Sequence, residues 1–285
     1  MHILIFFLCT ILMTNAAVAQ DPRPEPGKQV PQKMTVPKST SVWKWEGGGE
    51  NFAKLLATPK PLDESGTEDL QYLLFLPKDY NAEKVYDDSK QILPKAKEWP
   101  LLLFLHGAGE RGDEVNRVAI HGPAKRLAKE PETAEICPFI VVSPQCHTDR
   151  YWSPAQLHLL LDEIEKQYKV DKQRIYVTGL SMGGFGTWML TADRPERFAA
   201  VAPICGGSDI SLAEKFVGTP LWVFHGEADM LVPVKLSRDM VKAVEEAGGK
   251  KVKLTTYPGV NHDSWTQTYE NQELYEWFLS HSRND

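Results

Sequence analysis

Several features that define other classes of protein are missing from this sequence. Basic residues are not in excess, since 32 Lys and Arg stand against 38 Asp and Glu, which gives a formal net charge of −6. A nucleic-acid-binding protein is therefore not expected, because such proteins present a basic surface. The first apolar run, residues 3–13, falls short of the roughly 20 residues that span a bilayer. No internal repeat is present either, so neither a stable membrane anchor nor a repetitive structural role is expected.

Cysteine is scarce, with four in the whole chain, and no C-x-x-C spacing occurs. No metal and no cofactor are therefore expected. Removal of residues 1–19 would leave Cys137, Cys146 and Cys205, an odd number, so at least one thiol lacks a partner within the chain. Cys137 and Cys146 flank the apolar run 139–142, and an extended strand there would hold them about 30 Å apart, too far for a disulfide. We expect all three to be buried as small apolar side chains.

The sequence of the first 60 residues does not have the pattern expected of a folded core. Residues 1–19 combine an apolar run with Ala17-Val18-Ala19 before Gln20, which is typical of a signal peptide with an A-x-A cleavage site, although no Lys or Arg precedes the run. We therefore expect a secreted or periplasmic protein. Residues 20–60 are predicted to form a Pro-rich tether and an N-terminal segment, 42–49, that the sequence does not assign. A single catalytic domain is expected over residues 61–285.

Short apolar runs alternate with helical patterns through the rest of the chain. Strands are predicted at residues 71–77, 100–105, 139–142, 175–177, 199–205, 220–224 and 253–257. Helices are predicted near 123–129, from Pro154 with Ser153 as N-cap, after residue 181, from about 234 to 248, and around 274–278. This alternation predicts right-handed βαβ units, a mostly parallel sheet flanked by helices, and functional residues in the loops after the strands.

The segment 174–186, RIYVTGLSMGGFG, reads as a strand, a sharp turn and a helix. Its centre, Gly179-Leu180-Ser181-Met182-Gly183, has the G-x-S-x-G pattern of a nucleophile elbow. Such a turn is strained and crowded, so the neighbouring positions must lack a Cβ. Ser181 is therefore the predicted nucleophile, and the Met182 N–H at the helix start is predicted to meet an oxyanion. An ordinary Gly-rich turn would give the same pattern, so the partner residues decide between the two interpretations.

A serine nucleophile needs a general base, and the base needs an orienting acid. These partners follow the elbow in the order acid, then histidine. One loop after a predicted strand offers Glu227 and Asp229. Asp229 is the favoured acid, and Glu227 would instead cap the next helix or be solvated. His262 follows the last predicted strand and is the favoured base over His225, which suits a structural hydrogen bond, and His281, which lies near the terminus.

The loop HGAGERG follows the strand predicted at residues 100–105. Its glycines allow main-chain N–H groups to approach a ligand, and the Ala108 N–H is predicted as the second oxyanion donor. His106 is expected to brace the loop rather than to act as a base or a metal ligand. Arg111 is a candidate contact for a substrate anion, with a salt bridge to Glu110 or Asp113 as the structural alternative.

Two tryptophans in loops after strands, Trp152 and Trp265, are candidate walls of a substrate cleft. An exposed or core position explains either side chain equally well.

Four motifs in order, LLLFLHGAGERG, GLSMGG, HGEADMLVP and GVNHDSW, resemble the α/β-hydrolase superfamily. The chain is similar to secreted bacterial carboxylesterases of the phospholipase/carboxylesterase and "predicted peptidase" type, and to dienelactone hydrolases, polyhydroxybutyrate depolymerase-like enzymes and feruloyl esterases. The resemblance covers about residues 68–278 and implies an α/β-hydrolase fold. It also implies a serine carboxylesterase with the triad Ser181, Asp229 and His262, and an oxyanion hole from Ala108 and Met182.

About a dozen residues separate Gly207 from Leu221, so no large cap domain is expected. An open cleft suits a short acyl group, an aryl ester or an ester carried on a polymer such as a polysaccharide. Two other functions stay open. A serine peptidase of the prolyl-oligopeptidase type is disfavoured because no propeller-sized partner domain is present, and a non-catalytic binding protein is disfavoured because all three triad members are present in order.

Overall fold

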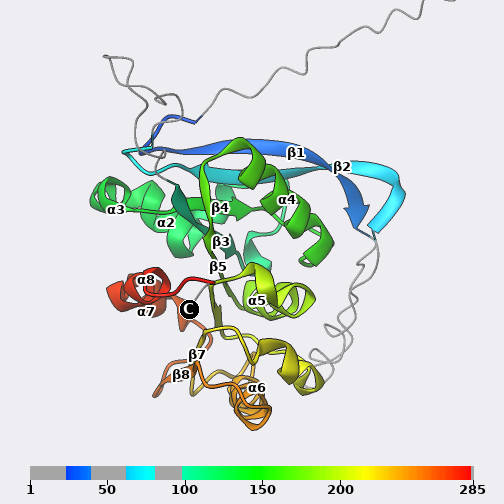
Figure 1. Cartoon of the computed structure of the whole chain (residues 1–285), viewed down its shortest axis with the longest axis vertical. Coiled ribbons are helices and arrows are strands. Elements are labelled where there is room, and N and C mark those ends of the chain that lie inside the picture. The colour runs from blue at the N-terminus through cyan, green and yellow to red at the C-terminus, as the bar shows by residue number, and fades with distance from the viewer. Residues whose placement is uncertain (1–23, 40–61, 81–97, 284–285) are drawn as a thin grey trace, which may run out of the picture.

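The computed structural model describes residues 24–39, 62–80 and 98–283. This part of the chain contains an open eight-stranded sheet in the order β1-β2-β4-β3-β5-β6-β7-β8 (Figure 1). The parallel part consists of β3 (Trp99–Leu105), β4 (Ile140–Pro144), β5 (Val170–Leu180), β6 (Ala200–Ile204), β7 (Leu221–Gly226) and β8 (Val252–Tyr257). The prediction of a mostly parallel sheet is confirmed.

Helices cover both faces of the sheet (Figure 1). One face packs against α4 (Pro154–Gln167), α5 (Met182–Asp193) and α6 (Lys235–Glu246). The other face packs against α2 (Gly122–Lys129), α3 (Pro131–Ile136), α7 (Trp265–Glu270) and α8 (Gln272–Leu279). Because both faces are covered, every residue of β3, β4, β6 and β7 is buried, which explains why these strands are apolar without alternation.

The helix boundaries follow local signals. At the start of α4, the Ser153 hydroxyl accepts a hydrogen bond from the Gln156 N–H at 3.5 Å, and Pro154 occupies the first helical position. The buried side chains Leu157, Leu161 and Ile164 recur at helical spacing, as predicted.

An antiparallel hairpin at one edge of the sheet overturns part of the N-terminal prediction. β1 (Gln29–Ser39) pairs with β2 (Leu62–Phe75), and β2 pairs with β4. The expected tether over residues 20–60 is therefore wrong for β1. The prolines in this segment favoured a tether over a strand. β1 is an edge strand, however, and an edge strand tolerates proline, which has no N–H to donate. The side chains of β1 alternate between the two faces of the sheet. Val36 is buried against the core, whereas Pro31 and Thr35 face solvent.

The expected signal peptide, residues 1–19, and the segment 42–49 lie outside the described residues. Between β6 and β7 the chain forms one short 3₁₀ helix, Ile210–Phe216, which agrees with the prediction that no large cap is inserted there. Among the helices of the described ranges, none combines the length and the apolar character of a membrane span. The three described cysteines are free thiols, with Cys146 and Cys205 buried and Cys137 half-buried.

Candidate active site

Ser181 lies in a strained turn between β5 and α5. Its φ is 52° and its ψ −114°, a conformation that non-glycine residues rarely adopt. The glycines around it permit this turn. A Cβ on Gly183 would lie 1.9 Å from the Leu105 carbonyl oxygen, and one on Gly179 would lie 2.4 Å from the Gly183 carbonyl oxygen. The predicted strand, sharp turn and helix are therefore present, with Ser181 at the apex.

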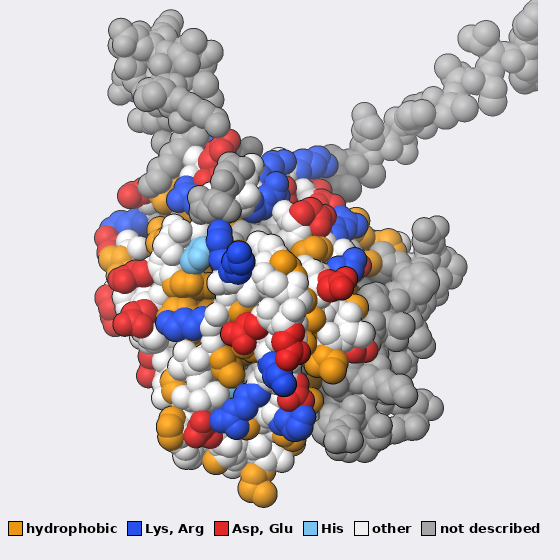
Figure 2. All heavy atoms as spheres, turned by 60° about the horizontal axis from the view of Figure 1, so that its bottom comes forward, with side chains coloured by type: hydrophobic (Ala, Val, Ile, Leu, Met, Phe, Trp, Pro, Cys, Tyr) orange, Lys and Arg blue, Asp and Glu red, His pale blue; other side chains and the backbone are white. Residues whose placement is uncertain are grey.

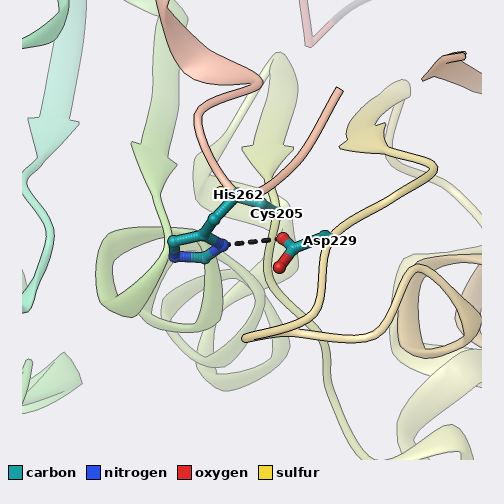
Figure 3. Close-up of side chains that lie close together, drawn as sticks. All are labelled: Cys205, Asp229 and His262. Carbon is teal, nitrogen blue, oxygen red and sulfur yellow. Dashed lines mark hydrogen bonds and ion pairs between the residues drawn. The ribbon is translucent and has the colours of Figure 1, made fainter. Parts of the chain in front are cut away.

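The structure brings Ser181, His262 and Asp229 together from three different loops. The Ser181 Oγ lies 2.9 Å from His262 Nε2, and His262 Nδ1 lies 2.7 Å from Asp229 Oδ2. Figure 3 shows the imidazole turned edge-on toward this carboxylate. Because a carboxylate only accepts hydrogen bonds, Nδ1 carries the proton and donates to Asp229. Nε2 is then free to accept from the serine hydroxyl, which is the arrangement a general base requires.

The Asp229 carboxyl is held by donors from its own loop. Its Oδ1 accepts hydrogen bonds from the N–H groups of Leu231 and Val232, at 2.9 and 2.8 Å. Burial alone would raise the pKa of Asp229, but hydrogen bonds with His225, His262 and the Val232 N–H outweigh that effect and hold the pKa well below its usual value. The group facing His262 is therefore a carboxylate throughout the neutral range.

The competing candidates have other partners, and one of them, His225, contacts the predicted acid itself, with its Nε2 3.3 Å from Asp229 Oδ2. Glu227 accepts hydrogen bonds from Arg238 on α6 and from the Thr256 hydroxyl, both at 2.9 Å. His225 is fully buried and bonds through Nδ1 to the Ser237 hydroxyl and through Nε2 to the Val232 carbonyl, both at 2.8 Å. This is the structural role expected for it. His281 lies beyond the end of α8, where its Nδ1 bonds to the Trp277 carbonyl at 2.8 Å.

The loop after β3 packs directly against the elbow. β3 and β5 are paired with Leu105 opposite Gly179, and a Cβ on Gly107 would lie 2.7 Å from a methyl group of Leu180. Ala108 begins a 3₁₀ helix (Ala108–Glu110) and Met182 begins α5. The first N–H groups of a helix have no acceptor within it, so both predicted oxyanion donors occupy positions without a partner inside their own helix, and their role stays a prediction.

Side chains that the sequence did not single out hold this loop. Glu110 is buried, and its Oε2 accepts from the Gly107 N–H at 2.9 Å. Arg117 donates to the Gly109 carbonyl at 2.7 Å, and Gln145 donates to the Glu110 carbonyl at 2.9 Å. The sequence suggested Glu110 only as a partner for Arg111. Its bond to the Gly107 N–H is the glutamate half of a capping box, which is hard to recognise in the sequence because glycine stands where the motif usually has Ser or Thr.

His106 braces the loop, as expected. The ring is fully buried, with Nδ1 2.6 Å from the Gly107 carbonyl oxygen and Nε2 accepting from the Cys146 N–H at 2.9 Å. Burial lowers the pKa of His106 to about 4, an effect that the bond to Gly107 opposes and that Arg111 and Arg117 reinforce. The ring is therefore neutral, with its proton on Nδ1.

The three candidate substrate contacts, Arg111, Trp152 and Trp265, have different surroundings in the structure. Arg111 donates to the carbonyls of Ala108 and Arg150, at 3.1 and 3.3 Å, and lies 5.4 Å from the centre of the Tyr151 ring, so it braces the loop without the expected salt bridge. A substrate contact for Arg111 stays a prediction. Trp152 is 3% exposed and donates to the His106 carbonyl at 3.2 Å, so most of its side chain lies in the core, and its part in a cleft wall stays a prediction.

Trp265 is the tryptophan that lies beside the serine loop. Its ring packs edge-on against His262 at 5.2 Å between centroids and against His121 at 5.5 Å. It therefore supports the imidazole directly and remains a candidate wall.

Cys205, which the sequence suggested only as a buried apolar side chain, contacts the elbow. Its Sγ accepts from the Ser181 N–H at 3.3 Å, and its own φ is 40°. The Cys205 sulfur, an Asp229 carboxylate oxygen and a His262 ring nitrogen lie within 4.8 Å of one another (Figure 3). Ligands of one metal ion can have this spacing. These atoms are engaged with each other and with Ser181, and burial raises the pKa of the Cys205 thiol, so the set does not fit a metal ion without breaking the chain of hydrogen bonds.

Comparison with known proteins agrees with this architecture. Residues 149–275 match the model of the dienelactone hydrolase family. The solved structure of a thermostable esterase is 37% identical, with a TM-score of 0.66, over 77% of this chain and 61% of that one. A bifunctional acetylxylan esterase/xylanase of Neocallimastix patriciarum is 26% identical over 62% of this chain and 26% of its own length.

An uncharacterized secreted protein of Arthroderma benhamiae is also 26% identical, over 59% of this chain and 22% of its own length. The chain thus spans about a quarter of the length of these two curated relatives. The chain therefore has an α/β-hydrolase fold, and its residues 149–275 are similar to the dienelactone hydrolase family.

Proposed function

We propose that this protein is a serine carboxylesterase. In the proposed reaction, the Ser181 Oγ attacks the ester carbonyl while His262 Nε2 takes the hydroxyl proton. The N–H groups of Ala108 and Met182 donate to the oxyanion, and His262 returns the proton to the leaving alcohol. Water, deprotonated by the same imidazole, then releases the acid from the acyl-enzyme and restores the serine.

The observation that carries the proposal is the continuous hydrogen-bonded chain from Ser181 through His262 to Asp229. Each atom in it has the role that acyl transfer requires: a hydroxyl donor, an imidazole with its acceptor nitrogen toward the serine, and a buried carboxylate. A strained serine at a helix start adds a second requirement of the reaction, a main-chain donor beside the nucleophile.

The surroundings of the serine favour short acyl or aryl esters, including esters carried on polysaccharides. No cap domain lies between β6 and β7 to enclose a long chain. The neighbouring loops expose apolar side chains instead: Met230 and Leu231 follow Asp229, and Ile210 follows β6. Relatives named as a thermostable esterase and an acetylxylan esterase support the same class of reaction.

The test compares wild type with Ser181→Ala on p-nitrophenyl esters from acetate to dodecanoate and on methyl ferulate. We expect wild type to cleave short or aryl esters and the variant to lose at least about 10³-fold in kcat. Ser280→Ala, which alters an exposed serine just after α8, serves as the matched control and should retain the wild-type rate. Retained activity in Ser181→Ala would exclude the proposed nucleophile. Cleavage of peptide anilides without cleavage of any ester would favour the serine peptidase instead.

We also propose that the protein acts outside the cytoplasm. The apolar leader with its A-x-A site supports export, as does the secreted relative. Mass spectrometry of the exported protein should give an N-terminus at Gln20, and an intact Met1 would contradict the proposal.

Nucleic acid is not a proposed partner. On the face that Figure 2 shows, acidic and basic side chains are interspersed rather than gathered into a basic stripe, in keeping with the net charge of −6.

A further inference from the structure

The Asp229 carboxylate has one contact that the proposed reaction does not use. Its Oδ1 accepts hydrogen bonds from the main-chain N–H groups of Leu231 and Val232. Its Oδ2 lies between two imidazoles, 2.7 Å from His262 Nδ1 and 3.3 Å from His225 Nε2. The side chains of Asp229 and His225 are both 0% exposed, so this second contact is shielded from solvent.

The partners of His225 Nε2 require that this nitrogen carries a proton. It lies 2.8 Å from the Val232 carbonyl oxygen, in addition to its contact with Asp229. A carbonyl oxygen and a carboxylate oxygen only accept hydrogen bonds, and the pKa of Asp229 is held well below its usual value. The Nε2–H is therefore shared between the two oxygens, with the shorter bond to the carbonyl.

Asp229, Val232 and His225 form a closed set of contacts. Val232 donates its N–H to the carboxylate and accepts from the imidazole through its carbonyl, while the imidazole N–H also faces the carboxylate. Because each member is held by the other two, none can turn without weakening two contacts. A buried network whose members are all satisfied fixes one arrangement of its side chains.

The imidazole of His225 is also held from its other side. The residue belongs to β7, and its Nδ1 lies 2.8 Å from the Ser237 hydroxyl oxygen on α6. That oxygen lies 3.2 Å from the Gly206 carbonyl oxygen. Gly206 follows Cys205, whose sulfur accepts from the Ser181 N–H. The ring thus joins the loop of Asp229 to the segment that lies behind the nucleophile.

The outer side of the Asp229 loop contributes little to the position of the carboxylate. Met230 is 90% exposed and Leu231 is 60% exposed, so neither side chain packs over it. The side chain of Asn261 accepts from the Met230 N–H at 3.2 Å, but this bond holds the main chain and not the carboxylate. The orientation of Asp229 therefore depends on its two main-chain donors and on His225.

We propose that His225 is a positioning residue whose Nε2–H fixes the Asp229 carboxylate in the orientation that accepts the His262 Nδ1 proton. The ring is fully buried and acts through Asp229, without contact with substrate. This inference rests on the proposed function for its effect on the rate, whereas the orientation of Asp229 can be measured without any substrate. A histidine that only supports the fold would contribute to stability and leave kcat unchanged.

The kinetic test compares two replacements of His225. In His225→Gln the amide nitrogen can take the place of Nε2 and donate to Val232 and Asp229, whereas the shorter side chain of His225→Asn reaches only toward Ser237. We expect His225→Asn to lower the kcat for a p-nitrophenyl ester about 10- to 100-fold with KM within about twofold, and His225→Gln to restore most of the rate.

The matched control for this comparison is His158→Asn, which removes another buried imidazole, on α4. Thermal unfolding of both Asn variants measures the structural part of each substitution. His158→Asn should lower the melting temperature and keep kcat. A wild-type kcat in folded His225→Asn would overturn the inference, because the contact with Asp229 would then serve stability alone.

Nuclear magnetic resonance of the protein with ¹⁵N-labelled histidine supplies a test without substrate. In wild type the His225 ring should carry a proton on Nε2, and an unprotonated Nε2 would overturn the inference even if every variant at this position failed to fold. The His262 Nδ1–H signal should move in His225→Asn and stay in His158→Asn. If these signals behave as expected but wild type cleaves no ester, the positioning role stands and the proposed function is refuted.

Discussion

The buried histidine behind the predicted oxyanion loop makes the fold sensitive to acid. Burial lowers the pKa of His106 from its ordinary 6.5 to about 4, although the hydrogen bond to Gly107 works in the opposite direction. The unfolded chain therefore takes up a proton below about pH 6.5, whereas the folded protein does not do so until about pH 4. Because the unfolded state binds more protons in this window, the free energy of unfolding falls as the pH falls.

The size of the effect follows from the two pKa values. The difference between 6.5 and about 4 amounts to about 3 kcal/mol once the pH is below both. Between about pH 7.5 and about pH 5 the expected loss is about 2 kcal/mol. Above about pH 7.5 the ring is neutral in both states, so no dependence from His106 is expected there. Protonation of Nε2 would also remove the acceptor of the Cys146 N–H.

Urea unfolding followed by tryptophan fluorescence tests this reasoning. His106→Gln removes the titrating group, so the variant should be less stable at neutral pH but should lose about 2 kcal/mol less than wild type between the two pH values. Burial also lowers the pKa of His158, to about 3, but that contribution is present in both proteins and cancels in the difference. Equal losses in wild type and His106→Gln would refute the assignment of acid sensitivity to this ring.

Two further predictions concern the triad and the elbow. Asp229→Asn should lower the kcat for a cleaved ester about 10⁴-fold. The amide oxygen would stay on the Leu231 and Val232 N–H groups, so the amide NH2 would face His262 Nδ1 and favour the tautomer whose Nε2 cannot accept the serine proton. Glu227→Gln should stay within about twofold, and equal effects in a steady-state assay would contradict the choice of acid. Gly183→Ala should lower the free energy of unfolding by about 4 kcal/mol or more, because the new Cβ would lie 1.9 Å from the Leu105 carbonyl oxygen. Gly109→Ala is the control, since its Cβ would meet open space, and thermal unfolding should show a change below about 0.5 kcal/mol.

The fold and the centre of the site are predictable from the sequence because their signals are local. An apolar strand before Gly179, a serine between glycines and a helical pattern after it lie within thirteen residues, 174–186. Asp229 and His262 were found because the order of the triad and the ends of parallel strands narrow the search to two loops. The choice against Glu227 then follows from geometry, since only the structure shows that carboxylate bound to Arg238.

The rest depends on contacts between distant segments, which leave no local pattern. β1 carries prolines that are typical of a tether, and its place at the sheet edge becomes visible only when it pairs with β2. Trp152 lies in a loop but turns inward because its indole N–H finds the His106 carbonyl. The contact of His225 with Ser237 and Gly206 likewise joins β7, α6 and the turn after β6, so no periodicity reveals it.

The hydrogen bond from His106 to Gly107 has a geometric consequence for the neighbouring amide. The carbonyl of Gly107 and the N–H of Ala108 belong to one planar trans peptide, so they point in opposite directions. With its carbonyl turned toward the His106 ring, that peptide plane directs the Ala108 N–H away from the ring. The next plane is held as well, because Arg111 binds the Ala108 carbonyl. Neither plane can rotate without breaking a bond to a side chain, so the Ala108 N–H, the predicted oxyanion donor, is held in one orientation by the protein alone.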